Sequence, residues 1–131
     1  MPVKIMLDTN FLLIPAQFKV DVFEEIKRIC DFNYEVVVLD RTIYELNGIV
    51  QSQAGSDKAA ARLGLQLLET KKVRVISTKT ATFKNVDKIF LEMAAGERLI
   101  VATQDKLLKQ ELKKLGSKVI VLMQKKYLVL E

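Results

Sequence analysis

Four acidic residues occupy positions where an α/β protein gathers ligands: Asp8, Glu45, Asp87 and Asp105. Asp8 directly follows the apolar run at residues 5–7 and therefore lies at the end of a predicted strand. The other three each lie at or just after the start of a predicted helix. Loops at the carboxyl ends of strands in an open α/β sheet converge on one crevice. Four carboxylates in one crevice would bind a hard divalent metal.

Neighbouring polar residues could complete such a site. Thr9, Asn10 and Thr103 could add hydroxyl or amide contacts to a ligand, a coordinated water or a scissile phosphate. Magnesium prefers oxygen ligands and usually keeps several waters, so two to four carboxylates form a plausible set of ligands. The chemistry that such a site suits is hydrolysis of a phosphodiester.

The absence of histidine narrows the other options. The chain contains no histidine, which removes Ser-His-Asp and Cys-His triads and the usual histidine-containing zinc sites. It contains one cysteine, Cys30, which excludes an intramolecular disulfide. Cys30 falls on the apolar face of a predicted helix, so we expect a small buried hydrophobic residue rather than a nucleophile. Chemistry must rest on carboxylates, hydroxyls, lysines or metal.

The charge balance suits a polyanionic substrate. Lys and Arg number 21 against 16 Asp and Glu, a net charge of +5. A basic protein that clusters acids in one crevice attracts a polyanion over its surface while it holds cations at the site. Net charge of this size is weak evidence for nucleic-acid binding on its own, because many ordinary domains reach it without binding nucleic acid.

Length and composition predict one globular domain over residues 1–131. Half of the residues are apolar, and no apolar run approaches the roughly 18 residues of a membrane span. The opening Met-Pro-Val-Lys-Ile does not lead into a signal-peptide pattern. The expected compartment is the cytoplasm.

Strand and helix patterns alternate along the chain. Predicted strands cover residues 3–7, 35–39, 73–76, 99–102 and 119–123, with a short edge strand at 127–130. Predicted helices cover residues 18–30, 57–69 and 106–115, and two more start behind the N-caps Asp40 and Asn85. Residues 51–56 are predicted to be a loop and the best candidate for a mobile segment. This alternation predicts a three-layer α/β/α sandwich around a parallel sheet.

These residues together resemble the motifs of the PIN domain, a family of metal-dependent ribonucleases related to the flap-nuclease fold. The resemblance rests on four segments, in matching order along essentially the whole chain: Leu7-Asp8-Thr9-Asn10, Glu45-Leu46, Val86-Asp87 and Ala102-Thr103-Gln104-Asp105. It implies a central five-stranded parallel sheet with the first strand in the middle. It also implies Mg²⁺ or Mn²⁺ as cofactor, with catalytic and metal-binding roles for Asp8, Glu45, Asp87 and Asp105 and support from Asn10 and Thr103.

Within the family, residues 11–15 and 125–131 resemble archaeal relatives of the PIN nucleases that process small-subunit ribosomal RNA. The sequence departs from the common pattern at Gln104, where Thr-Asn-Asp or Thr-Asp-Asp is usual, and no acid follows at residues 106–108. This departure argues against a second metal. No Cys-rich zinc module is present, so substrate selectivity must come from this domain or from partners.

The leading hypothesis is a metal-dependent endoribonuclease that hydrolyses RNA phosphodiesters, with precursor rRNA as the expected partner. Two alternatives stay open. One is a catalytically weak RNA-binding factor in ribosome assembly. The other is a toxin ribonuclease of the VapC type, which would bring an antitoxin as partner. PIN relatives are often dimers, so a homodimer is also open.

Basic residues offer an RNA track, with a solvated surface as the plain alternative for each. The candidates are Lys109 and Lys113 on one predicted helix and Lys125 and Lys126 near the C-terminus. Lys71, Lys72 and Arg74 could extend the track, and Tyr127 or Phe83 could offer a stacking surface.

Each acid also has a plain structural interpretation. Asp8 could cap the turn after its strand, and Glu45 could be a solvated helix residue. Asp87 and Asp105 lie near helix starts, where the helix dipole stabilises negative charge. Only the four together, in this order, predict a site.

Overall fold

The computed structural model describes residues 2–79, 86–96 and 98–131, and only the backbone of residues 86, 87 and 96. Six strands within these residues form one sheet: β1 (Val3–Leu7), β2 (Tyr34–Leu39), β3 (Arg74–Ile76), β4 (Leu99–Ala102), β5 (Val119–Met123) and β6 (Tyr127–Leu130). Their order is β3-β2-β1-β4-β5-β6. The first five strands are parallel, and β6 pairs antiparallel with β5. The predicted five-stranded parallel sheet with a central first strand is confirmed, with β6 as the predicted edge strand.

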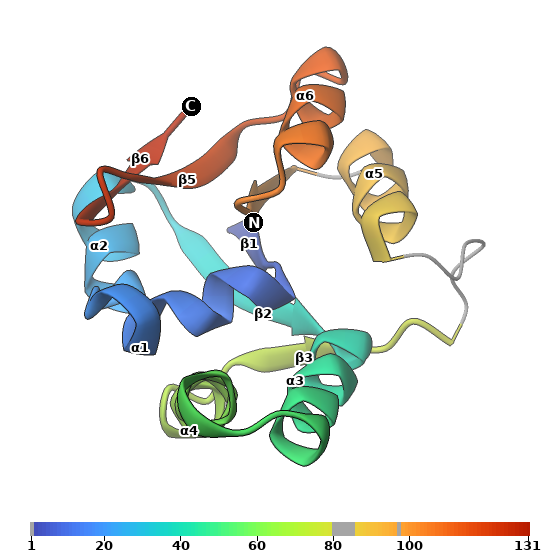
Figure 1. Cartoon of the computed structure of the whole chain (residues 1–131). Helices are drawn as coiled ribbons and strands as arrows, with labels where there is room; N and C mark the ends of the chain where they lie inside the picture. The colour runs from blue at the N-terminus through green and yellow to red at the C-terminus, as the bar shows by residue number, and fades with distance from the viewer. Residues whose placement is uncertain (1, 80–85, 97) are drawn as a thin grey trace.

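Helices cover both faces of this sheet (Figure 1). One face carries the 3-10 helix η1 (Thr9–Leu13), α1 (Ile14–Phe18), α2 (Val22–Ile29), α3 (Asp40–Ser52) and α4 (Gly55–Thr70). The other carries α5 (Val86–Gly96) and α6 (Lys106–Lys114). Side chains of β1 alternate between the two, because Ile5 and Leu7 join one core cluster and Met6 joins the other. The three-layer α/β/α prediction is confirmed.

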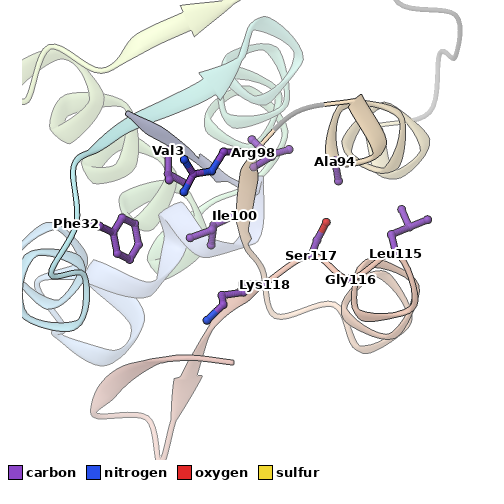
Figure 2. Close-up of a pocket in the computed structure, with 10 residues that line it drawn as sticks. Val3, Phe32, Ala94, Arg98, Ile100, Leu115, Gly116, Ser117 and Lys118 are labelled. Carbon is purple, nitrogen blue, oxygen red and sulfur yellow. The ribbon is translucent and has the colours of Figure 1, made fainter. Parts of the chain in front are cut away.

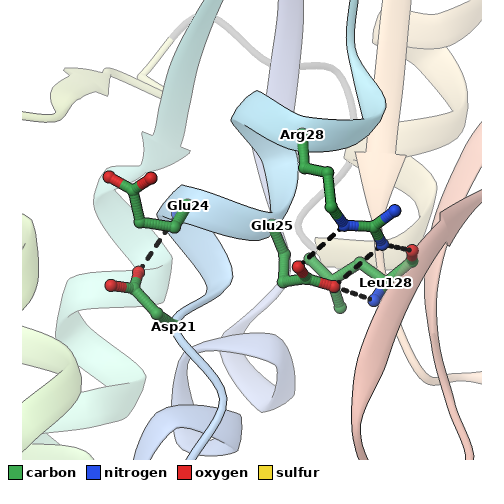
Figure 3. Close-up of polar contacts among 5 residues, drawn as sticks. All are labelled: Asp21, Glu24, Glu25, Arg28 and Leu128. Carbon is green, nitrogen blue, oxygen red and sulfur yellow. Dashed lines mark hydrogen bonds and ion pairs between the residues drawn. The ribbon is translucent and has the colours of Figure 1, made fainter.

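The first predicted helix, residues 18–30, begins later than expected. Phe18 ends α1, and Lys19 follows in a left-handed conformation with φ of 54°. Helix α2 then starts at Val22, capped by the Asp21 carboxylate, which accepts the Glu24 N–H at 3.1 Å (Figure 3). Phe18 lies four residues before Val22, so apolar periodicity alone could not separate the two helices.

Two short helices before this point were not predicted. Proline usually interrupts a helix, but Pro15 lies in the first turn of α1. Backbone N–H groups in the first turn make no hydrogen bond within the helix, so the missing N–H of proline costs nothing there. The predicted burial of Cys30 is confirmed: it is 7% exposed, in the same core cluster as Val22 and Ile26.

The predicted loop at residues 51–56 is wrong at most positions. Helix α3 continues to Ser52 and α4 begins at Gly55, so only residues 53–54 connect them. The predicted N-cap at Asp40 is also wrong, because α3 begins at Asp40 itself. The Asp40 carboxylate instead accepts the Arg41 N–H and both the N–H and hydroxyl of Thr78, which follows β3. Asn85, the other predicted cap, lies outside the described residues.

Close packing of α4 against η1 depends on one glycine. A Cβ atom at Gly64 would lie 2.8 Å from the carbonyl oxygen of Leu12, closer than real Cβ contacts allow. Gly64 is therefore explained by the packing of the chain on itself. No helix among the described residues is long and apolar enough to cross a membrane.

Side chains of α2 bind the outer edge of strand β6. Glu25 Oε1 accepts the Leu128 N–H at 2.9 Å, and Arg28 Nη2 donates to the Leu128 carbonyl at 3.1 Å (Figure 3). Glu25 and Arg28 also form an ion pair at 2.9 Å. Both backbone groups of Leu128 are thereby paired, which blocks that point of the edge against another strand.

We expect Glu25→Gln to lower the free energy of unfolding by about 1 kcal/mol at pH 7, because it weakens charge-assisted bonds at a partly exposed site. The hydrogen bond from Arg28 lowers the pKa of the Glu25 carboxyl. The charged Glu25 carboxylate therefore stabilises the fold above the ordinary glutamate pKa of about 4.3. This stabilisation is lost as pH falls through the lower pKa of Glu25 in the folded state. Urea denaturation at pH 7 and in acid measures both effects.

The matched control is Glu24→Gln, which makes the same change one residue away, at an exposed side chain outside this network. Equal stability of the two variants at pH 7 would contradict a stabilising role for the bonds from Glu25 and Arg28 to Leu128.

Candidate active site

Asp8 is a buried carboxylate at the carboxyl end of the central strand. It is 8% exposed and directly follows β1. Its Oδ1 accepts the Thr9 N–H at 2.8 Å, and its Oδ2 accepts the Thr103 hydroxyl at 2.8 Å. Leu7 pairs with Ala102 in the sheet, so Asp8 and Thr103 leave neighbouring strands at the same level. The sheet register itself brings these two residues together.

Threonine hydroxyls connect Asp8 to two more acids. The hydroxyl of Thr9 donates to Glu45 Oε1 at 3.0 Å, which joins η1 to α3. The hydroxyl oxygen of Thr103 accepts the Asp105 N–H at 3.1 Å. Asp105 in turn caps α6, because its Oδ1 accepts the Leu108 N–H at 3.0 Å. Thr9 therefore links Asp8 to Glu45, and Thr103 links Asp8 to the backbone of Asp105.

Burial and the neighbouring acids affect the pKa of the Asp8 carboxyl. Burial raises the pKa of the Asp8 carboxyl, and the negative charges of Glu45 and Asp105 raise it further, against the lowering effect of its two hydrogen bonds. The net direction is above the ordinary aspartate pKa. A buried carboxylate of raised pKa beside other acids is typical of functional sites.

Asp40 provides an internal comparison. It also lies at the end of a strand, accepts the N–H of the next residue and accepts the hydroxyl of a threonine beyond the neighbouring strand. Partial burial raises its pKa, but the hydrogen bonds from Thr78 and Arg41 and the Arg41 charge outweigh this, so the net pKa is lowered. The same local arrangement thus favours the charged form at Asp40 and opposes it at Asp8. The difference comes from the deeper burial and the neighbouring acids at Asp8, and from the additional Thr78 N–H bond and the Arg41 charge at Asp40.

The remaining predicted residues are placed as follows. Asn10 is exposed in η1, beside Thr9. Asp87 is the second residue of α5, and its side chain lies outside the described part of the structure. The position of the Asp87 carboxylate relative to the other three acids therefore stays a prediction.

The donor chemistry around Asp8 fits a hard divalent cation. Carboxylate and hydroxyl oxygens are the ligands that Mg²⁺ and Mn²⁺ prefer. Within the described part of the chain, Glu45 Oε2 and Asp105 Oδ2 accept no hydrogen bond. Within the same residues, no three acidic side chains already stand close enough to form a cage. A cation bound here would keep several waters, as magnesium usually does.

A groove opens beside Glu45, between η1 and α3. Its volume is about 590 Å³. It is lined by Thr9, Asn10, Glu45, Gly48, Ile49, Gln51 and Ser52. All but Ile49 and Gly48 carry polar side chains. The groove therefore combines polar side chains with apolar surface, which is the larger part of its lining.

A second cavity, of about 520 Å³, lies at the opposite edge of the sheet, where β1, β4 and β5 begin (Figure 2). Figure 2 shows Arg98, Lys118 and the ring of Phe32 at this cavity. Its described lining contains no carboxylate, whereas Glu45 lines the groove between η1 and α3.

Comparison with known proteins decides the family. Residues 5–125 match a family model described as a PIN-like domain. The chain belongs to the PIN-domain family. Ribonuclease VapC4 of Methanocaldococcus jannaschii is 34% identical over 125 residues, which span 95% of this chain and 93% of that protein.

Solved structures show the same PIN fold. A structure described as the PIN domain endonuclease Utp24 matches 99% of this chain and 92% of its own with a TM-score of 0.77 at 20% identity. A domain of a protein of unknown function from Methanocaldococcus jannaschii matches with a TM-score of 0.61 at 16% identity, over 92% of this chain and 91% of its own. Both likenesses concern the fold alone.

The predicted lysines of this PIN domain divide between the two edges. Lys125 and Lys126 lie in the turn after β5, beyond its carboxyl end, and Lys109 lies one turn after Asp105. Lys113 instead lies near the end of α6 and pairs at 3.3 Å with Glu131, whose backbone pairs with Val119 at the start of β5. Arg74, at the start of β3, pairs with Glu35.

Sequence patterns did not reveal the two threonine bridges as such. Thr9 and Thr103 were expected to contact a ligand, whereas they bond to protein carboxylates that lie 36 and 95 residues away in the chain. The positions of β1 and β4 in the sequence do not indicate that Thr103 bonds to Asp8. The match of Thr103 to the family motif was the one usable indication.

We expect Asp8→Asn to raise the melting temperature of the metal-free PIN domain by several degrees at pH 7, because it removes a buried charge opposed by two others. Asp8 holds its proton more tightly in the folded state, so wild-type stability falls as pH rises from about 4 through the raised pKa. The difference in melting temperature between the wild type and Asp8→Asn should grow over the same pH range. Thermal melts in a metal chelator from pH 3.5 upward measure it, and a lower melting temperature for Asp8→Asn at pH 7 would contradict the assignment.

Proposed function

We propose that this PIN domain is a divalent-metal-dependent endoribonuclease. The observation that carries the proposal is the grouping of Asp8, Glu45 and Asp105 around two threonine hydroxyls at the carboxyl edge of the sheet. The net charge of +5 supports a polyanionic substrate. The relative at 34% identity bears the name ribonuclease, which supports RNA as that substrate.

Mg²⁺ or Mn²⁺ is the proposed cofactor, held by Asp8, Glu45 and Asp105, with Asp87 assigned through the family motif. When bound, such a cation activates water and stabilises the negative charge that develops on a phosphodiester. Without it, the three carboxylates repel the RNA phosphates. RNA should therefore occupy this site only together with a cation.

The protein's own contribution is orientation. Thr103 and the Thr9 N–H each hold one oxygen of Asp8, so its carboxylate cannot rotate freely. Thr9 holds Glu45 in the same way, and the Leu108 N–H holds Asp105. Glu45 Oε2 and Asp105 Oδ2, which accept no hydrogen bond from the described residues, remain for a cation or for the proton of an attacking water.

Two functions are proposed, in order of preference. Processing of precursor rRNA comes first, because residues 11–15 and 125–131 resemble the rRNA-processing PIN nucleases. A toxin ribonuclease comes second, and the named relative VapC4 specifically favours it. An antitoxin partner belongs to that second function only. Growth arrest on expression, relieved by a cognate antitoxin, distinguishes the toxin from the processing enzyme.

RNA contacts are proposed for Lys109, Lys125 and Lys126, which lie toward the edge of the sheet that carries the acids. Lys125 occupies a left-handed backbone position with φ of 57°, after Gln124 with φ of 53°. Hairpin turns of this kind favour Asn-Gly, and a lysine there carries a cost in conformational energy. A positive charge that persists at an unfavourable position supports a role in binding.

We expect Asp8→Asn and Asp105→Asn each to lower RNA cleavage in Mn²⁺ by at least about 100-fold, because each removes an anionic oxygen ligand. The measurement is cleavage of a labelled RNA that spans the 3′ end of a small-subunit rRNA. Asp40→Asn is the matched control: it changes the other strand-end carboxylate and should weaken folding through Thr78 while cleavage persists.

Wild-type rates in the Asp8 and Asp105 variants would overturn the site assignment. RNA binding without cleavage by the wild type in Mn²⁺ would favour the assembly-factor alternative.

We expect Lys125→Gly to raise the free energy of unfolding by about 1 kcal/mol, because glycine relieves the left-handed backbone. It should also weaken RNA binding and reduce the slope of log affinity against log salt by about 0.7. Lys113→Ala, which changes a lysine near the opposite edge, should leave both RNA quantities unchanged. Filter binding over a range of salt measures this, and equal losses in the two variants would contradict the proposed track.

A further inference from the structure

Two cationic side chains line the cavity at the amino edge of the sheet. This cavity, of about 520 Å³, lies where β1, β4 and β5 begin, and its lining includes Arg98 and Lys118. Neither side chain makes a hydrogen bond or an ion pair with the described residues. The Glu131 carboxylate, which lies near the start of β5, is bonded to Lys113 instead. The described lining therefore carries two positive charges and no carboxylate.

An aromatic ring and a hydroxyl complete this lining. In Figure 2 the charged ends of Arg98 and Lys118 are directed toward the side of the cavity that carries the ring of Phe32. That ring packs edge-on against Tyr34, with 6.5 Å between the ring centroids, and this contact restricts its orientation. The Ser117 hydroxyl also lines the cavity and makes no hydrogen bond with the described residues. Groups for an anion and for a planar ring thus share one cavity.

This combination suits a nucleotide that carries a terminal phosphate. A phosphate monoester has a charge of roughly −1.5 to −2 near neutral pH, which matches two cations. A guanidinium binds two phosphate oxygens at once, and an aromatic ring can stack on a base. The cavity volume lies within the usual range of about 300–1,000 Å³ for small-molecule sites. An internal phosphodiester carries only one negative charge, so the two cations favour a terminal phosphate.

The helix ends at this edge oppose an anion, but by less than the two cations favour it. Helices α5 and α6 both end here, and the carboxyl end of a helix carries roughly half a negative elementary charge. In α6, the carbonyls of Leu112 and Lys113 already accept the N–H groups of Ser117 and Gly116 at 3.0 Å. Arg98 and Lys118 each contribute a full positive charge. The balance at the cavity is therefore positive.

We infer that this cavity is a second ligand site, which binds a nucleoside monophosphate either as a free nucleotide or as the phosphorylated end of an RNA strand. Arg98 and Lys118 bind the phosphate, and the ring of Phe32 stacks on the base. Strand β1 has five residues, so the cavity lies roughly 16 Å from Asp8 at the other end of the strand. The ligand is separate from any bound beside the acids, and the inference does not depend on the proposed endoribonuclease.

The first test is binding of adenosine 5′- and 3′-monophosphate, measured by isothermal titration calorimetry in a metal chelator. Without a cation, the acids at the carboxyl edge repel a phosphate and do not contribute to binding. We expect Arg98→Gln and Lys118→Gln each to weaken binding of the nucleotide by about tenfold, because each removes a charge-assisted bond. Lys114→Gln is the matched control: it removes the same charge at an exposed residue of α6 outside the cavity, and should change affinity by less than about twofold.

The second test separates the base from the phosphate. Ribose 5-phosphate has the phosphate without the base, so it should bind roughly tenfold more weakly than the nucleotide. Phe32→Leu keeps an apolar side chain but removes the ring. It should abolish the difference between the two ligands and leave the affinity for ribose 5-phosphate unchanged, with a thermal melt to show that the variant is folded.

A set of short RNAs identifies the source of the ligand. Oligoribonucleotides with a 5′- or 3′-phosphate are compared with the same sequence that ends in hydroxyls. Tighter binding of a phosphorylated RNA, lost in Arg98→Gln, supports an RNA end as the ligand. Binding of adenosine monophosphate with equal affinity for all of the RNAs supports a free nucleotide.

Three results overturn the inference. They are no binding of either adenosine monophosphate at millimolar concentration, equal affinity for the nucleotide and for ribose 5-phosphate, and equal losses in Lys118→Gln and Lys114→Gln. None of them bears on the proposed endoribonuclease, whose acids lie at the other edge of the sheet. Loss of RNA cleavage in Asp8→Asn, in turn, leaves nucleotide binding at this cavity unaffected.

Discussion

The burial of the Asp8 carboxylate is the constraint on which the site depends. Removal of a charge from water is costly unless hydrogen bonds or an opposite charge compensate for it. Asp8 has two hydrogen bonds, from Thr9 and Thr103, yet its pKa is raised, because the charges of Glu45 and Asp105 add to the effect of burial. In the proposed function, a divalent cation supplies the missing compensation. The fold would then maintain an unfavourable carboxylate that the proposed cation makes favourable.

The position of this carboxylate follows from the sheet. β1 lies at the centre, between β2 and β4, so both of its neighbours deliver polar residues beside it. The same edge carries two positions that oppose local conformational preference: a glycine inside α3 at Gly48 and a left-handed lysine at Lys125. Natural sequences tend to depart from local rules at functional sites.

Much of the fold could be predicted from the sequence. The β-branched runs at residues 35–39 and 119–123 mark strands buried on both faces, and the end of α6 was signalled by Gly116, whose φ is 80°. Predictions failed where tertiary contacts override local signals. Asp40 has the composition of a cap but binds Thr78, and Gln51 and Ser52 resemble a loop although they continue α3.

The site divides in the same way. Its acids could be named from the family motifs, because those motifs occur at fixed places in the sequence. Their electrostatic coupling could not, since it depends on the register of β1 with β4 and on the packing of α3 against η1. The groove and the cavity lined by Arg98 and Lys118 also required the structure, because spacing alone does not show which side chains meet at one edge of the sheet.

The most direct test of this account is an NMR titration of the Asp8 carboxyl with and without Mg²⁺. The account requires a pKa above the ordinary aspartate value in metal-free protein and a decrease when Mg²⁺ is added. A pKa at or below the ordinary value that does not respond to Mg²⁺ would contradict it, because Asp8 would then be a structural hydrogen-bond acceptor like Asp40.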